Sequence, residues 1–117
     1  MVEITKTSRD FDKVETYLMT VAPGITSLKD VPDGTSITVS GTLEFNDVKE
    51  ITGEVTEIVS IITPDKKVYS AQSKTVKRSL SDIEKIMDGE QFAVIKTSGL
   101  TKAGRTFINV ELDTSKL

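Results

Sequence analysis

The sequence predicts a single mainly β (α+β) domain in which five strands are joined by one internal helix and preceded by another helix. Three observations favour this fold class. The apolar residues follow the pattern of strands in five segments and the pattern of helices in two. The chain has 117 residues, which suits one hydrophobic core and one domain over residues 1–117. No internal repeat or low-complexity linker divides it.

The first predicted element is a helix over residues 8–21, where four apolar residues recur with a helical period. Ser8 is expected to cap its first turn, and Pro23-Gly24 is expected to end it. The sequence leaves open whether the apolar stripe packs across the sheet or pairs with a neighbouring subunit in a homo-oligomer. The stripe consists of Phe11, Val14, Leu18 and Val21.

Five strands are expected in the rest of the chain, with a second helix between the third and the fourth. In the first strand, Gly41 falls on the apolar side, which indicates a bend or a close approach of another group. The second strand is apolar on both sides, as a bulge or burial of both faces would produce. The helix is expected to end at Gly89. The strands are expected at residues 35–45, 54–63, 67–72, 90–97 and 105–112, and the helix at residues 74–88.

This order of elements is that of the OB-fold, a partly open five-stranded Greek-key barrel. An ordinary α+β sandwich shares the same order. We favour an OB-like barrel over residues 35–112 because the internal helix falls in the gap between strands three and four, which this fold fills with a helix. The helix at the N-terminus is then an addition to the barrel.

The composition makes catalysis and metal binding unfavourable. The chain has no cysteine, which excludes disulfides, thiolate nucleophiles and thiolate metal sites. It has no histidine, which removes the usual general base at neutral pH and the commonest ligand of transition metals. We therefore expect no enzyme activity, no metal and no cofactor. We also expect no membrane span, because no apolar run is long enough.

The charge is unevenly distributed along the chain. The net charge is −3, yet residues 1–65 hold 5 basic and 12 acidic side chains, whereas residues 66–105 hold 9 basic and 4 acidic ones. Such a basic zone in an acidic protein indicates an anionic partner. The alternative is that these lysines and arginines are ordinary solvated surface residues.

The basic zone contains two cation–aromatic pairs, in which a cation precedes an aromatic by two residues on a predicted strand. They are Lys67 with Tyr69 and Arg105 with Phe107. This spacing places both side chains on one face, where the cation can contact a phosphate and the ring can stack on a base. In an OB barrel the ligand contacts strands two and three and the loops between strands one and two and between four and five. Gly99 and Gly104 are expected to let the last of these loops bend around a ligand. The candidate contacts to nucleic acid are Lys67, Tyr69, Lys96, Lys102, Arg105 and Phe107.

Phe107 has a second interpretation, as a core residue beneath the N-terminal helix. Phe45 and Phe92 share the phase of aliphatic neighbours and are expected in the core. Single-stranded nucleic acid is favoured over duplex DNA, because no segment resembles a recognition helix for the major groove.

Three stretches resemble the small single-stranded DNA-binding proteins that bacteriophages encode for replication. They are "DGTSITVSGTLEF" (33–45), "PDKKVYSAQS" (64–73) and "FAVIKTSGLTKAGRTFINVEL" (92–112). The resemblance implies an OB-type fold, cooperative and sequence-independent binding to displaced single strands of DNA, no metal and no catalysis. It also implies replication proteins as partners, a location in the host cytoplasm, and a binding surface on the six candidate residues.

An alternative function remains open on the same fold. A protein-interaction or adaptor module would also use exposed aromatic residues, and it would keep its affinity at higher salt because it neutralises no phosphates. A small enzyme is the least favoured class, given the missing histidine and cysteine.

Overall fold

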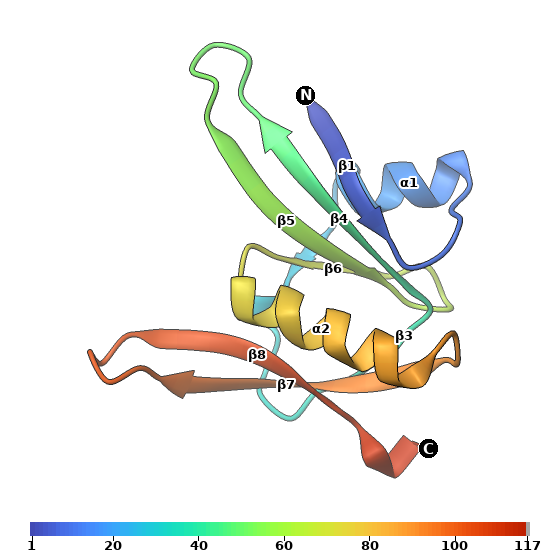
Figure 1. The fold of residues 1–117 in the computed structure, drawn as a ribbon, viewed down its shortest axis with the longest axis vertical. Coiled ribbons are helices and arrows are strands. Elements are labelled where there is room, and N and C mark those ends of the chain that lie inside the picture. Colours follow the sequence, from blue (N-terminus) through green and yellow to red (C-terminus); the bar gives the residue numbers. More distant parts are fainter. Residues whose placement is uncertain (117) are drawn as a thin grey trace.

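A long helix lies between two β-sheets (Figure 1). The computed structural model describes residues 1–116. Within them, no helix is long and apolar enough to cross a membrane. The elements are β1 (Val2–Thr7), α1 (Lys13–Thr20), β2 (Thr26–Ser27), η1 (Leu28–Asp30), β3 (Ser36–Val39), β4 (Gly41–Val48), β5 (Val55–Ile62), β6 (Val68–Ala71), α2 (Lys74–Met87), β7 (Phe92–Leu100), β8 (Thr106–Leu112) and η2 (Thr114–Lys116).

The larger sheet has the strand order β1-β4-β5-β6-β2, and the smaller has the order β3-β7-β8. Only Ser40 separates β3 from β4, so one nearly continuous segment contributes a strand to each sheet. This pair replaces the single strand expected at residues 35–45. The mainly β class is confirmed. Within residues 1–116, however, the sheets do not close into a barrel, because β6 and β8 are not paired.

The main core lies between the two sheets and includes one face of α2. Val76 and Leu80 are buried there, and Ile83 and Met87 pack at its margin, so the helical apolar pattern expected at residues 74–88 is confirmed. Phe92 belongs to this core, as expected. The helix ends at Met87, just before the expected stop, because the next residue already adopts a left-handed conformation.

A second core lies on the other face of the larger sheet, beneath α1. It contains the fully buried side chains of Met19 and Ile62, together with the predicted core residue Phe45. Strand β5 contributes to both cores, since Val59 and Ile61 face the first one. Its register with β4 is unbroken, so burial of both faces, and not a bulge, explains the apolar pattern of this strand.

The N-terminal helix differs from the one expected at residues 8–21. It begins at Lys13 and is capped by Asp12, whose carboxylate accepts a hydrogen bond from the backbone N–H of Glu15. The side chain of Glu15 reaches back to the Asp12 backbone N–H, which completes a capping box. Half of the expected apolar stripe is confirmed, since Phe11 and Leu18 pack against the second core. The other half is wrong, because Val14 and Val21 are 66% and 62% exposed.

In place of the first helical turns, the residues before α1 form strand β1 and a short segment, residues 8–11, that packs against the start of β4. Strand β1 pairs with β4 at the edge of the larger sheet. Ser8, the expected helix cap, instead accepts a hydrogen bond from the backbone N–H of Thr42. The guanidinium of Arg9 lies 4.4 Å from the centroid of the Phe11 ring. That ring fills the space beside Gly41, which confirms the close approach expected there.

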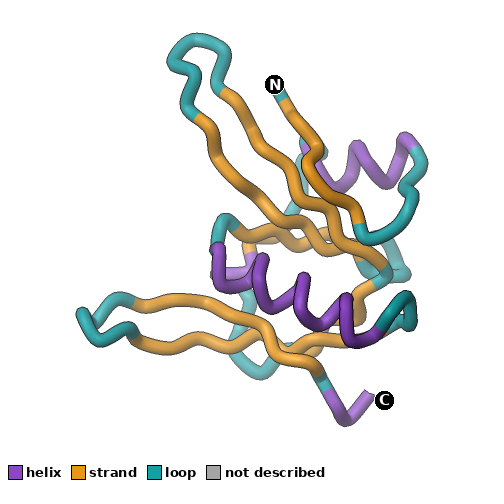
Figure 2. The backbone as a smooth tube through the Cα atoms, in the orientation of Figure 1, coloured by secondary structure: helices purple, strands orange, loops and turns teal. Residues whose placement is uncertain are grey.

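Two hairpins extend beyond the helices as separate arms (Figures 1 and 2). One is formed by β4 and β5, and the other by β7 and β8. The second arm carries the glycine-rich basic segment singled out in the sequence, so the fold presents this segment away from the cores.

Candidate nucleic-acid interface

The turn of the β7–β8 hairpin presents two free cations. Lys102 and Arg105 are exposed, and neither forms an ion pair with any of residues 1–116. The turn itself is ordered by backbone hydrogen bonds from Thr101 to Arg105 (2.8 Å) and from Gly104 to Thr101 (2.9 Å). Gly104 has a φ of 80°, a conformation that glycine adopts without strain. The hairpin therefore holds both cations at the surface on a defined backbone.

Phe107 follows on β8 and is 38% exposed. It is paired across the hairpin with Gly99 of β7, and the far end of its ring lies over that glycine. The alternative placement of Phe107 beneath the N-terminal helix is wrong, because α1 packs on the larger sheet. The aromatic ring is thus exposed on the same hairpin as Lys102 and Arg105.

A groove of about 630 Å³ runs beside this ring. Its walls come from Ser27 and Lys29, from Ile58 and residues 70–73, and from residues 106–108 of β8. Among residues 1–116, no acidic residue lines it. Lys29 is exposed and forms no ion pair within the described part of the chain. An open groove with an aromatic ring, a free cation and no carboxylate suits a polyanion with flat bases.

A second groove of about 370 Å³ lies at the start of β6, and none of the described acidic residues lines it. It is lined by Lys67 and Tyr69, together with residues 22–26 before and within β2. Lys67 is largely exposed, with its ammonium nitrogen 3.9 Å from a carboxylate oxygen of Asp65. Tyr69 is half-buried and packs against the core between the sheets, so less of its ring is available than expected.

The two grooves are neighbours along β6. Thr26 and Tyr69 line one groove and pair with each other, whereas Ser27 and Ser70 line the other and also pair. The short β2–β6 ladder therefore separates them. Of the cation–aromatic pairs expected from the sequence, Lys67 and Tyr69 both line the smaller groove, whereas only Phe107 of the second pair lines the larger one.

Lys96 does not join this surface. It is only 5% exposed, and its ammonium nitrogen lies 2.8 Å from a carboxylate oxygen of Asp33. Hydrogen bonds from Lys96 and then from Ser98 lower the pKa of Asp33. The charge of Lys96 is thus neutralised inside the fold, and the structure separates it from the other five candidates.

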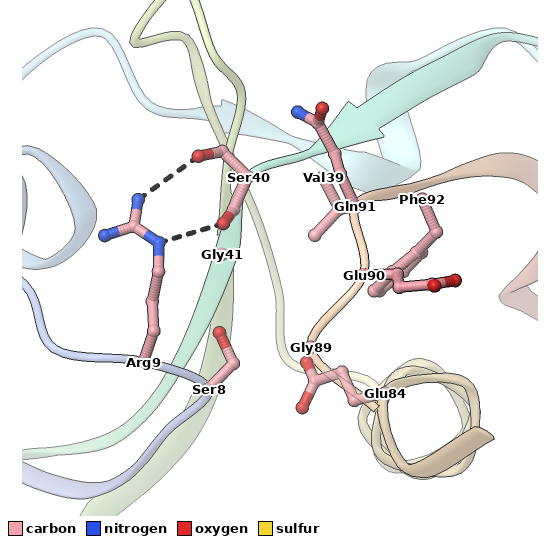
Figure 3. A pocket seen from close by; sticks show the side chains of 10 residues that line it. All are labelled: Ser8, Arg9, Val39, Ser40, Gly41, Glu84, Gly89, Glu90, Gln91 and Phe92. Carbon is pink, nitrogen blue, oxygen red and sulfur yellow. Dashed lines mark hydrogen bonds between the residues drawn. The ribbon is translucent and has the colours of Figure 1, made fainter. Parts of the chain in front are cut away.

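A third pocket, of about 300 Å³, lies between the N-terminal segment, the β3–β4 junction and the loop after α2 (Figure 3). Arg9 donates from Nε to the backbone oxygen of Ser40 (2.9 Å) and from Nη2 to the carboxylate of Glu15 (2.9 Å). Glu84 and Glu90 also line this pocket. Since Arg9 is already engaged and two carboxylates are present, this pocket suits an anion poorly.

Sequence reasoning missed two features of the interface. Lys29 lies in η1 within the acidic half of the chain, and only the β2–β6 pairing brings it beside β8. Gly99 was expected in a flexible loop, whereas it lies within β7 under the Phe107 ring. No local sequence pattern marks either residue, because both depend on strand pairing.

Comparison with known proteins gives a consistent result. A family model described as "Phage Single-stranded DNA-binding protein" matches residues 5–113. The single-stranded DNA-binding proteins of Bacillus phage PZA and Bacillus phage phi29 are each 31% identical to this chain over 91 residues. The aligned segment covers 74% of this chain and 73% of each relative. No solved structure matches the chain.

Proposed function

The chain belongs to the family of phage single-stranded DNA-binding proteins, and we propose that it binds single-stranded DNA without regard to sequence and protects displaced strands during phage DNA replication. The observation that carries this proposal is the groove beside β8, which is lined by the exposed ring of Phe107 and by Lys29 and, among residues 1–116, by no acidic side chain. In this role the protein acts in the host cytoplasm, without a cofactor and without catalysis.

The proposed strand passes the β7–β8 turn, where Lys102 and Arg105 contact phosphates, and enters the groove between Phe107 and Lys29. It continues over the β2–β6 ladder toward Lys67. The ring of Phe107 offers a stacking surface that accepts any base, which gives affinity without sequence preference. Lys96 is left out of this path because it is buried and paired.

We further propose that the two sheets are an open form of one OB-like domain. The segment β3–β4 corresponds to strand one, β5 and β6 to strands two and three, and β7 and β8 to strands four and five. In support, β3 pairs with β7, β7 pairs with β8, and α2 fills the gap between the third and fourth strands. On this assignment the large groove lies at the opening between strands three and five, and β1 and α1 are additions to the barrel.

The test is binding to a fluorescently labelled oligo-dT, followed by anisotropy, beside a matched duplex. We expect tight binding to the single strand at about 50 mM salt, weaker binding at about 200 mM, and weak binding to the duplex. Phe107→Ala should weaken binding to the single strand at both salt concentrations. Tyr17→Ala is the matched control, because Tyr17 is an exposed aromatic on α1 that lines neither groove. No binding of the wild-type protein to oligo-dT at the lower salt would refute the proposal.

A further inference from the structure

We infer that Gly99 positions the ring of Phe107 for stacking on a nucleobase, so that a residue without a side chain belongs to the binding site. This inference rests on the proposed function and adds to it a residue that makes no polar contact. The role is that of a positioning residue, because Gly99 acts through Phe107.

The geometry of the hairpin carries the inference. Gly99 and Phe107 are direct partners in the β7–β8 register. A Cβ atom at position 99 would lie 2.8 Å from Cζ and 3.0 Å from Cε1 of the Phe107 ring. Carbon atoms are in favourable contact only at about 3.5–4.0 Å, so the ring occupies the space that a side chain would need. The ring therefore leans across β7 and rests on the bare backbone of Gly99.

A second glycine in this protein provides a comparison. A Cβ atom at Gly41 would lie 2.7 Å from both Cε1 and Cζ of Phe11, so this ring also rests on a glycine. The Phe11 ring, however, is covered by the guanidinium of Arg9 at 4.4 Å from its centroid. Within residues 1–116, no cation stacks on Phe107, which stays 38% exposed. The ring that rests on Gly41 is therefore covered by a cation, whereas the ring that rests on Gly99 stays open to a ligand.

The consequence for binding is preorganisation. An exposed phenylalanine on a strand ordinarily samples several rotamers, and ordering its side chain on binding lowers affinity. Because the far end of the ring already lies over Gly99, the Phe107 side chain is ordered in the free protein, before DNA binds. The side of the ring turned away from the backbone is then available to a base next to the groove.

The experiment is a double-mutant cycle with Gly99→Ala and Phe107→Ala, measured as the dissociation constant for oligo-dT. We expect Gly99→Ala to weaken binding about fivefold, the lower end of the loss for one stacked base, with an unchanged dependence on salt. In the Phe107→Ala background the same substitution should have no further effect, because the ring through which it acts is absent. Gly41→Ala is the matched control, and it should retain the wild-type affinity.

A spectroscopic readout separates positioning from a general loss of structure. An oligonucleotide that carries 2-aminopurine reports stacking through its fluorescence, and Gly99→Ala should reduce the change seen on binding. Wild-type affinity of Gly99→Ala, or an equal loss in both backgrounds, would overturn the inference while leaving the proposed function intact. If the wild-type protein does not bind oligo-dT, the proposed function fails and the inference fails with it.

Discussion

Replacing Arg105 with glutamine is expected to make binding to single-stranded DNA less sensitive to salt. Four cations lie along the proposed path: Lys29 and Lys67 line the grooves, and Lys102 and Arg105 lie at the β7–β8 turn. Lys66 also lines the smaller groove, but it is paired with Glu15. Each neutralised phosphate of a single strand contributes about −0.7 to the slope of log K against log salt, so four contacts give about −3. Affinity should then fall about 50-fold between roughly 50 and 200 mM salt. With Arg105 removed, three contacts predict a fall of about 20-fold.

The assay is a series of anisotropy titrations at four or more salt concentrations. Lys85→Gln is the control, because Lys85 is an exposed lysine of α2 that lies outside both grooves and outside the β7–β8 turn. Phe107→Ala should lower affinity at every salt concentration and leave the slope unchanged, since the ring neutralises no phosphate. A wild-type slope for Arg105→Gln together with a reduced slope for Lys85→Gln would refute the proposed path and place the phosphates along α2.

Three further predictions concern the fold. Met19→Ala should lower the free energy of unfolding by about 2–5 kcal/mol in urea titrations, because its side chain is fully buried between α1 and the larger sheet; an unchanged stability would contradict that packing. Hydrogen bonds from Arg9 and then Lys66 lower the pKa of Glu15 from 4.5 to about 2. Its stabilising effect is therefore complete above pH 4.5 and is lost as the pH falls toward 2, so Glu15→Gln should be less sensitive to acid than the wild type over this range. Burial raises the pKa of Glu84, which means that its contribution to stability is lost as the pH rises. The melting temperature of Glu84→Gln relative to that of the wild type should accordingly increase as the pH rises above 4.5. A difference between the two melting temperatures that does not change with pH would contradict this prediction.

The sequence predicts the elements whose burial has a simple period. Helix α2 keeps one apolar stripe in the main core, and the alternate residues Ile108, Val110 and Leu112 of β8 also pack there. Strand β1 carries no such pattern, since it lies at a sheet edge with most of its residues exposed. Helix α1 misleads because its buried face holds Glu15, whose carboxylate is satisfied by Arg9 and Lys66, while Val14 lies outside.

The candidate site is predicted best where local sequence alone decides exposure. The turn with Lys102 and Arg105 is such a place. Lys96 is buried and paired with Asp33, which is 63 residues away in the chain, and no local pattern reveals that contact. Tyr69 faces the core because its direct partner on β5 is the fully buried Ile61. Side-chain alternation gives the two faces of a strand, but only the pairing decides which face is inside.

The division of one segment between two sheets has a consequence for the order of events during synthesis. All five strands of the larger sheet lie before residue 72, so they can pair while the chain is still being made. Strand β3 finds its partner only in residues 92–95 of β7. Until β7 has been made, the backbone donors and acceptors of β3 stay unpaired. Closing the long loop between β3 and β7 slows the pairing that joins the two sheets. The nascent chain therefore passes through a stage in which an unpaired strand is tethered, through Ser40, to a sheet that is already formed.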